Sequence, residues 1–229
     1  SDLIIFQNKN DKELFFNHKI LKNQKTDIIP GSGVDTEYFY FNKNKTNNEI
    51  IKFLFIGRLI KDKGIIELIE AFETIQKTNK NVCLLLVGSL DKNNLSFITE
   101  SKVKVWKTNR IFHFLGYIED IREKIVESDC VILPSYREGM PRSLLEAASM
   151  GKPIITTDVP GCRDIVSNNM TGYLCKSQDT KDLINKIELF LKTSYEKRIQ
   201  MGKNARKIIL DRFDQKIIID KYLEHIFKS

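Results

Sequence analysis

Six short and nearly continuous apolar runs, which begin at residue 51, limit the fold of this chain more than any other feature. A strand with one face in water alternates apolar and polar residues, whereas a continuous run is typical of a strand buried on both faces of a parallel sheet. The runs cover residues 51–57, 82–88, 111–116, 129–135, 153–158 and 172–175. They therefore predict a parallel sheet that is covered by helices on both sides.

The segments between these runs have the spacing of amphipathic helices. The clearest is residues 63–76, KGIIELIEAFETIQ, in which Ile66, Ile69, Ala71 and Phe72 approximate a helical stripe. Parallel strands joined by helices need right-handed crossovers, and about five repeats of strand and helix follow one another here. The pattern predicts an α/β fold with a doubly wound parallel sheet, similar to the Rossmann fold.

Both ends of the chain fall outside this repeating unit. Residues 1–35 are predicted to form a strand, a helix and a loop, which cannot bury their own apolar faces and are therefore expected to belong to a preceding domain. The asparagine-rich residues 42–49 are predicted to be a loop or linker. The main domain is assigned to residues 36–212, with helices from about residue 179. The last helix, residues 213–229, is expected to pack toward the preceding domain.

Hydropathy and cysteine spacing argue against several classes of protein. No run of about 18 apolar residues could span a membrane, and the N-terminus lacks the pattern of a secretory signal, so a cytoplasmic location is expected. The cysteines have no C-x-x-C spacing and are expected to be buried, reduced thiols; they are Cys83, Cys130, Cys162 and Cys175. The histidines are isolated in sequence, so no metal site is predicted.

The net charge of +7 and the isoelectric point of about 9.1 are compatible with three anionic partners: nucleic acid, a membrane surface or a phosphorylated small molecule. The lysines are dispersed among glutamates and aspartates, which argues against nucleic acid. A lysine-rich composition without any role in binding explains the same charge equally well. Charge by itself therefore leaves the partner open.

Basic residues follow the first predicted strand of the sheet. Ligands of open α/β sheets bind at the carboxyl ends of the strands, where Gly57 and Arg58 lie, with Lys61 and Lys63 shortly after. Positive side chains at a helix start oppose the helix dipole, which favours anions there by about 0.3 to 1 kcal/mol. We predict a phosphate or diphosphate held by Arg58, Lys63 and nearby backbone N–H groups. The alternative is that these side chains extend into water.

A second helix start follows the fourth apolar run. Pro141 suits the first position of a helix, because its missing N–H would have no partner there. The N–H groups of Arg142, Ser143 and Leu144 would then point into the same crevice, where they could bind a phosphate.

Two glutamates, Glu138 and Glu146, lie on either side of this helix start. Eight residues of continuous helix would separate them by about 12 Å, which is comparable to the distance from the sugar to the ribose of a nucleotide-sugar. The alternative for Glu146 is a solvent-facing residue that pairs with Arg142 at i, i+4, opposite a leucine-rich core face. The alternative for Glu138 is a favourable charge near a helix start.

Several familiar motifs are absent. The chain contains no G-x-x-x-x-G-K-[ST] motif and no G-x-S-x-G motif, which argues against a P-loop nucleotide site and against an α/β-hydrolase. The sequence GSGVDT begins like the dinucleotide-binding motif G-x-G-x-x-G, but Thr36 stands where the third glycine should fall.

Five segments in register resemble one known family. In order and spacing they resemble the C-terminal half of the retaining family 4 glycosyltransferases of the GT-B fold. The segments are IIPGSGVDTEYF, FLFIGRLIKDKGIIELIEAF, LLLVGS, FLGYIEDIREKIVESDCVILPSYREGMPRSLLEAASMGKPIITTDVPGCRDIV and TGYLC. The likeness covers about residues 28–175. The variant EGMPRSLLEA is most similar to bacterial enzymes that build O-antigen, capsule or other surface glycans.

The resemblance implies a role for each matching residue. Arg58 and Lys63, with Gly57 before them, would bind the donor diphosphate and stabilise the charge of the leaving group. Glu138 would hydrogen-bond the donor sugar, and Glu146 would hold the ribose hydroxyls. The remaining donor contacts would come from the base pocket and from backbone groups before the helix; these positions are Tyr117, Ile118, Gly139, Met140, Pro141, Arg142, Ser143 and Leu144.

The resemblance also implies a mechanism and a substrate class. The family retains the anomeric configuration without an established protein nucleophile, and the leaving phosphate helps to deprotonate the acceptor. Catalysis would then depend on positioning and on electrostatic stabilisation of the departing diphosphate. No metal or cofactor is expected, because cationic side chains and helix N-termini stabilise that charge. The donor is expected to be a UDP-hexose or a UDP-N-acetylhexosamine.

The chain departs from the family pattern in one respect. GT-B enzymes have two Rossmann-like domains with the active site between them, and nearly all of the first, acceptor-binding domain is missing here. The chain is therefore expected to bind nucleotide without transferring sugar by itself. The implied acceptor is a glycan or a polyprenyl-diphosphate-linked oligosaccharide. Such an acceptor would place the intact enzyme peripherally at the inner face of the cell membrane.

Two other functions are compatible with the same sequence. A sugar-nucleotide epimerase can share the GT-B architecture and would act without an acceptor. A non-catalytic module could use the basic surface to bind nucleic acid or anionic lipid, with a steep dependence on salt.

Overall fold

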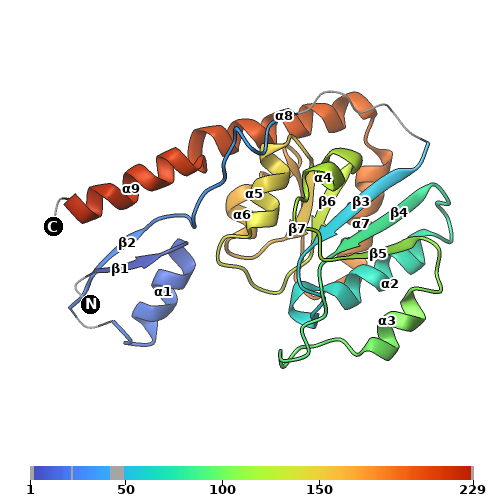
Figure 1. The fold of residues 1–229 in the computed structure, drawn as a ribbon, viewed down its shortest axis with the longest axis horizontal. Coiled ribbons are helices and arrows are strands. Elements are labelled where there is room, and N and C mark those ends of the chain that lie inside the picture. Colours follow the sequence, from blue (N-terminus) through green and yellow to red (C-terminus); the bar gives the residue numbers. More distant parts are fainter. Residues whose placement is uncertain (1–2, 22, 42–48, 228–229) are drawn as a thin grey trace.

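The main body of the protein is a six-stranded parallel sheet with helices on both faces (Figure 1). The computed structural model describes residues 3–21, 23–41 and 49–227. The strand order is β5-β4-β3-β6-β7-β8, with the first strand of the unit in the middle, and this is the strand order of the Rossmann fold. The strands are β3 (Ile51–Ile56), β4 (Val82–Val87), β5 (Phe112–Gly116), β6 (Cys130–Leu133), β7 (Ile154–Thr157) and β8 (Gly172–Cys175). The predicted doubly wound α/β fold is confirmed.

The helices divide between the two faces of the sheet. On one face α2 packs beside α7, and on the other α5 packs beside α8. Right-handed crossovers require this division, because the chain leaves the central strands in opposite directions. The helices of this body are α2 (Ile65–Ile75), α3 (Glu100–Trp106), α4 (Arg122–Glu127), α5 (Arg142–Ser149), α6 (Cys162–Ile165), α7 (Thr180–Lys192) and α8 (Tyr195–Arg212).

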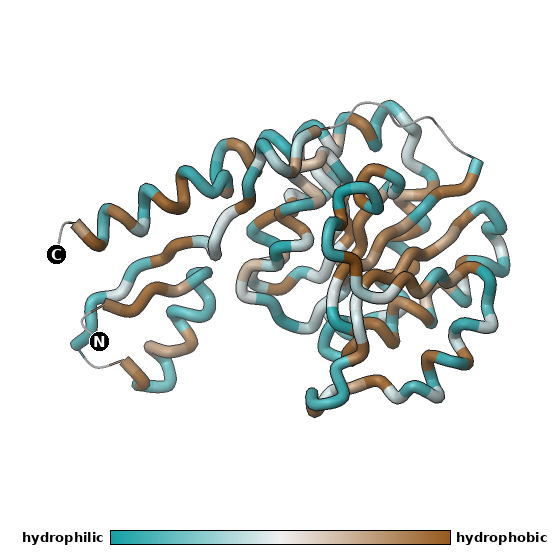
Figure 2. Tube along the Cα trace, viewed as in Figure 1, coloured by the Kyte–Doolittle hydropathy of each residue, from teal (hydrophilic) through white to brown (hydrophobic). Residues whose placement is uncertain are grey.

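The core lies between the sheet and its helices, where Figure 2 shows the apolar residues gathered along the strands. Phe53 of β3 contacts Phe72 of α2 and Phe190 of α7 edge to face, with ring centroids 5.1 and 5.5 Å apart. All three rings are completely buried. Such pairs add to the free energy of burial, so these rings fix α2 and α7 on the central strand.

Helix α2 begins later than the sequence predicted, and its buried face is different. A short 3-10 turn, η1 (Lys61–Lys63), precedes it, and Gly64 breaks the helix with a left-handed φ of 69°. A Cβ at this position would overlap the Pro134 carbonyl oxygen, so a glycine is needed there. Ile66, which was expected in the stripe, is half-buried. The buried face is Ile65, Leu68, Ile69, Ala71, Phe72 and Ile75.

The N-terminal residues form a separate small unit. Strand β1 (Leu3–Phe6) pairs in parallel with β2 (Lys25–Ile28), and α1 (Lys9–Asn17) connects them. The sequence predicted the first strand and the helix, but it missed β2, which has the polar sequence KTDI. The last residues of the chain form α9 (Gln215–Phe227).

Helix α9 lies beside this N-terminal unit (Figure 1). His225 Nε2 is 2.6 Å from Asp27 Oδ2, which joins α9 to β2. The unit and α9 expose several large apolar side chains, including Phe16, Ile20, Ile226 and Phe227. The predicted linker at residues 42–49 lies outside the described residues, except for its last residue.

The four cysteines are free thiols, and the prediction that all four are buried is wrong for Cys83. Cys130, Cys162 and Cys175 are buried, and Cys83 is half-buried. Burial raises the pKa of Cys162 and that of Cys175 to about 12. Among the described residues, none of the helices has both the length and the apolar character that a membrane span needs.

Candidate functional site

The loops after β3 and β6 meet at the carboxyl edge of the sheet. These two strands are neighbours, and the connections that follow them run to opposite sides of the sheet. Doubly wound folds have a crevice at such a point, and it is their usual ligand site. The structure therefore places the basic residues after β3 beside the loop that contains Glu138.

Lys63 and Glu138 form an ion pair in this crevice. The Lys63 ammonium donates to Glu138 Oε1, and the Ser135 hydroxyl donates to the same oxygen at 2.6 Å. The two side chains are 21% and 11% exposed. The residue expected to bind a diphosphate and the residue expected to bind the sugar are thus in direct contact.

Arg58 lies farther out than the prediction implied. Its guanidinium pairs with Asp91 Oδ2 at 2.8 Å and is 56% exposed. Asp91, in the loop after β4, was not predicted as a neighbour. Gly57 packs against the end of β4, where a Cβ on Gly88 would overlap the Gly57 carbonyl oxygen. Arg58 is therefore at the rim of the crevice, and it would have to leave Asp91 to reach a ligand deeper inside.

Tyr136 fixes the loop that carries Glu138. Its N–H donates to the Asp62 carbonyl oxygen at 2.9 Å, and its hydroxyl donates to Glu67 Oε1 at 2.7 Å. Burial raises the pKa of Tyr136, and the hydrogen bond to Glu67 adds to that effect. The sequence analysis missed both Tyr136 and Glu67, because a tyrosine in a loop and a glutamate in the first turn of a helix give no recognisable pattern.

Helix α5 begins one residue after the predicted position. Pro141 is the residue before the first turn, with φ −73° and ψ 111°, and the helix starts at Arg142. The Leu144 N–H donates to the Pro141 carbonyl oxygen at 3.1 Å. The prediction that this N–H is free to bind a phosphate is therefore wrong. The structure gives the N–H groups of Arg142 and Ser143 no acceptor among the described residues.

The start of α5 also corrects the estimate of the distance between the two glutamates. Residues 138–141 precede the helix, so Glu138 and Glu146 are not joined by continuous helix. The separation of about 12 Å assumed the rise of an unbroken helix and therefore does not apply.

A cavity of about 620 Å³ lies at the carboxyl edge of the sheet, next to α5. This volume is within the range of sites that bind small molecules. Four of the predicted donor-binding residues line it: Tyr117, Ile118, Arg142 and Glu146. The sequence analysis missed the other lining residues, which are Ser32, Gly33, Val34, Asp35, Tyr38, Phe39, Ile56, Glu119, Ile121 and Gln215.

Glu146 is a half-buried carboxylate in the wall of this cavity. Its side chain is 13% exposed, and the Arg142 guanidinium lies 3.5 Å away. Burial raises the pKa of Glu146 because it disfavours the ionised form, and the charge of Arg142 opposes part of this effect. The predicted i, i+4 pair is therefore present, but the alternative of a solvent-facing glutamate is wrong. Leu144, Leu145 and Ala148 form the expected core face.

Tyr117 and Ile118 also line the cavity, from the loop after β5. Gly116, the last residue of β5, has a left-handed φ of 72° and turns the chain there. Tyr117 is 78% exposed, whereas Ile118 packs against the core. An exposed aromatic ring and a half-buried aliphatic side chain in one cavity suit a flat, partly apolar group such as a nucleobase.

The loop of residues 139–140 touches the N-terminal unit. Asn8 Nδ2 donates to the Gly139 carbonyl oxygen at 3.2 Å, and a Cβ on Gly139 would overlap the amide of Gln7. A Cβ on Gly31 would lie 2.9 Å from the side chain of Met140. Residues that sequence analysis placed in a preceding domain thus contact the loop beside Glu138.

Metal ligands do not gather in the part of the chain that the structure describes. Residues 3–21, 23–41 and 49–227 contain no group of three or more His, Cys, Asp or Glu side chains that could hold a metal ion. The cations of the site are the side chains of Arg58, Lys63 and Arg142.

A second cavity, of about 350 Å³, lies at the opposite edge of the sheet. It is lined by residues that precede β6 and β7 and by residues of α8, including Asp129, Lys152 and Arg198. Ligand sites of doubly wound folds occur at the carboxyl edge rather than this one. We therefore assign the candidate functional site to the larger cavity beside α5.

Comparisons with known proteins identify the family of this chain. Residues 37–208 match the family model of the glycosyl transferases group 1. The chain is 33% identical over 235 residues to the N,N'-diacetylbacillosaminyl-diphospho-undecaprenol alpha-1,3-N-acetylgalactosaminyltransferase of Campylobacter jejuni, with 96% of the chain and 58% of that protein covered. It is 30% identical to the capsular polysaccharide biosynthesis glycosyltransferase CapM of Staphylococcus aureus, with 93% of the chain and 59% of that protein covered.

A solved structure shares the fold over the whole chain. The HepE protein of Anabaena, crystallised with UDP and glucose, superposes with a TM-score of 0.84 at 21% identity and covers 100% of this chain and 64% of its own. The chain spans about three fifths of the length of the curated relatives. The family match over residues 37–208 shows that this chain belongs to the group 1 glycosyltransferases, whose fold is GT-B.

Proposed function

We propose that this chain is the donor-binding half of a retaining glycosyltransferase that uses a UDP-linked hexose or N-acetylhexosamine. The observation that carries the proposal is the cavity that is lined by the half-buried Glu146, Tyr117 and Ile118, with the Lys63–Glu138 pair at the same edge of the sheet. The uracil would lie at Tyr117 and Ile118, and the ribose hydroxyls would donate to Glu146.

The charges of the site support this orientation of the donor. The cavity has three carboxylates, on Asp35, Glu119 and Glu146, and one guanidinium, on Arg142. Such a lining suits the neutral nucleoside, whose hydroxyl and N–H groups are hydrogen-bond donors, better than it suits a phosphate. The diphosphate would instead lie toward Lys63, Arg58 and the first N–H groups of α5, and the sugar would lie at Glu138.

The mechanism we propose needs no metal. Lys63 and the amide groups at the start of α5 would stabilise the charge that develops on the leaving diphosphate. Glu138 would orient the sugar, and the departing phosphate would accept the proton of the acceptor hydroxyl. The name of the Campylobacter jejuni relative states an alpha-linked product, and α-linked UDP-sugars would give such a product when the configuration is retained.

We further propose that the full protein has a preceding, acceptor-binding domain. Residues 1–35 and the last helix would complete that domain, because both expose apolar side chains that a partner domain would cover. A lipid-linked glycan of a bacterial surface polysaccharide would be the acceptor: the name of the Campylobacter jejuni relative gives that enzyme a diphospho-undecaprenol-linked acceptor, and the name of the Staphylococcus aureus relative states capsular polysaccharide biosynthesis. The net charge of +7 would favour an anionic membrane surface.

The direct test is calorimetric titration of the chain with UDP, GDP and ADP. We expect UDP to bind, and we expect Glu146→Ala to weaken binding while Glu196→Ala, an exposed glutamate at the start of α8, leaves it unchanged. Absence of binding by all three nucleotides would refute the proposal. Incubation of UDP-sugars with the chain alone should give no transfer, and the full-length protein should give an α-linked product by NMR; a β-linked product would exclude retention.

A further inference from the structure

One wall of the cavity is the segment that precedes the sheet. Residues 32–39, which we call the strap, contribute Val34, Asp35, Tyr38 and Phe39 to the lining. The facing wall is α5, which contributes Arg142 and Glu146. The spacing between the strap and α5 therefore sets the width of the pocket around Glu146.

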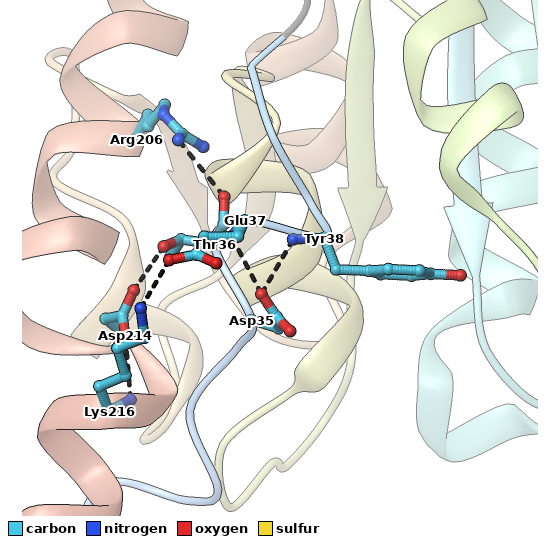
Figure 3. Close-up of polar contacts among 7 residues, drawn as sticks. All are labelled: Asp35, Thr36, Glu37, Tyr38, Arg206, Asp214 and Lys216. Carbon is cyan, nitrogen blue, oxygen red and sulfur yellow. Dashed lines mark hydrogen bonds and ion pairs between the residues drawn. The ribbon is translucent and has the colours of Figure 1, made fainter.

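The strap is attached to the junction between α8 and α9. The Val34 N–H donates to the Phe213 carbonyl oxygen at 2.9 Å, and the Gln215 N–H donates to the Val34 carbonyl oxygen at 2.9 Å. Farther along, the Thr36 hydroxyl donates to the Asp214 carboxylate, as Figure 3 shows. These bonds hold one edge of the strap against the C-terminal helices.

Arg206 of α8 joins the strap to the other wall. Its guanidinium donates to the carbonyl oxygens of Thr36, at 3.4 Å, and of Phe39, at 3.2 Å (Figure 3 draws the bond to Thr36). The same group donates to the carbonyl oxygen of Ser149, the last residue of α5. A single side chain therefore bonds to the backbone of both walls, three residues beyond Glu146 on the α5 side.

A guanidinium suits this position better than any other side chain. It has five N–H donors in a rigid plane, so it can bond several carbonyl oxygens at fixed directions, which an ammonium cannot do. A cation at the end of α5 is also favoured by the helix dipole. Burial lowers the pKa of Arg206, and the Asp214 carboxylate opposes this effect. The group keeps its charge, since the ordinary pKa of arginine is far above neutral pH.

We infer that Arg206 is a positioning residue for donor binding, which fixes the distance between the strap and α5. Arg206 acts from behind the walls, since it is not among the described residues that line the cavity. Loss of its three carbonyl contacts would leave the bond from the Ser149 hydroxyl to the Phe39 carbonyl oxygen, at 2.7 Å, as the link between the strap and α5. The strap could then move away from Glu146, and binding of the nucleoside would weaken. The identity of the ligand rests on the proposed function, whereas the connection between the two walls does not.

The test compares two arginines of the same helix. Arg198 also lies in α8, is partly buried and donates to a carbonyl oxygen, that of Leu191 at 2.9 Å, but it lies away from the strap. Arg206→Met, Arg206→Lys and Arg198→Met are each examined by amide hydrogen exchange and by titration with UDP. Arg206→Lys keeps the charge and guards against a methionine variant that fails to fold.

Arg206→Met should speed exchange of the Val34, Tyr38 and Phe39 amides, because the strap loses its bonds to the guanidinium. It should weaken UDP binding by about tenfold, or about 1.4 kcal/mol. The amide exchange rates and the UDP affinity of Arg206→Lys should lie between those of Arg206→Met and the wild type. Arg198→Met should change neither property. Equal weakening by Arg206→Met and Arg198→Met, or unchanged UDP binding in Arg206→Met, would overturn the inference. If the wild type binds no UDP, the proposed function fails, and unchanged exchange of the strap amides would then overturn the role of Arg206.

Discussion

Replacing Lys63 by methionine should destabilise the protein, because the Glu138 carboxylate is left without its cation. Breaking a fully buried ion pair by removing one partner costs about 3 to 5 kcal/mol, whereas an exposed pair contributes about 0.2 to 1 kcal/mol. The Lys63 and Glu138 side chains are 21% and 11% exposed, which is nearer the buried case, and the Ser135 hydroxyl still bonds Glu138. We expect a loss of about 2 kcal/mol in the free energy of unfolding, or about 4 to 8 °C in Tm for a domain of this size.

Urea unfolding measures this loss directly. The single tryptophan of the chain, Trp106, is 7% exposed and gives a fluorescence signal that should change on unfolding. Lys61→Met is the matched control, because Lys61 is an exposed lysine two residues away. The double variant Lys63→Met/Glu138→Gln should be more stable than Lys63→Met alone, since the unpaired charge is gone, with a coupling energy of about 1 to 2 kcal/mol.

Ligand binding separates the two members of the pair. Lys63→Met should weaken UDP binding, whereas Glu138→Gln should leave it unchanged or tighter, because it removes a negative charge from the region of the diphosphate. Transfer by the full-length protein should fall in both variants. The reasoning is refuted if Lys63→Met unfolds within about 0.5 kcal/mol of the wild type, or if the effects of the two single substitutions simply add.

Three further substitutions test other parts of the site. Glu146→Gln should raise Tm at pH 7 while weakening UDP binding. The pKa of Glu146 is raised in the folded protein, so ionisation of this side chain at high pH costs stability in the wild type. The difference in Tm between Glu146→Gln and the wild type should therefore shrink as the pH falls and vanish below the ordinary pKa of 4.5. A constant gain at all pH values would contradict this cause. Gly64→Ala should cost about 2 to 4 kcal/mol in urea unfolding, because a left-handed φ and an overlap with Pro134 coincide; a cost below about 1 kcal/mol would contradict it. Tyr136→Phe should cost about 1 to 2 kcal/mol by leaving Glu67 without its donor, and Tyr117→Phe, at a tyrosine that is 78% exposed, serves as the control.

The sheet was predictable because its signal is local. Each central strand is buried on both faces, so its own residues reveal it, and the six predicted runs contain the six strands of the sheet. Strand β2 lacks this signal, because KTDI is half exposed and polar. The break at Gly64 was missed for a related reason: the apolar spacing continues across it, and the need for glycine comes from Pro134, which is 70 residues away in sequence.

The candidate site was predictable in its residue types but not in its pairing. The carboxyl ends of β3 and β6 could be located, so Lys63 and Glu138 could be assigned to one crevice. Their direct contact depends on how Tyr136 folds the intervening loop onto Asp62 and Glu67. Glu146 shares its cavity with the strap, which lies about 110 residues earlier in the sequence and has no periodic pattern of its own.

The buried thiols described above make the site observable without any substitution. Cys162 begins α6, and its charge environment includes Glu138 and Lys63, so it lies close to the crevice. A thiol with a pKa of about 12 reacts with an alkylating reagent during transient opening of the structure. The rate at which Cys162 is labelled, measured beside that of the half-buried Cys83, therefore reports how often the donor crevice opens. A ligand that closes the crevice should slow the labelling of Cys162.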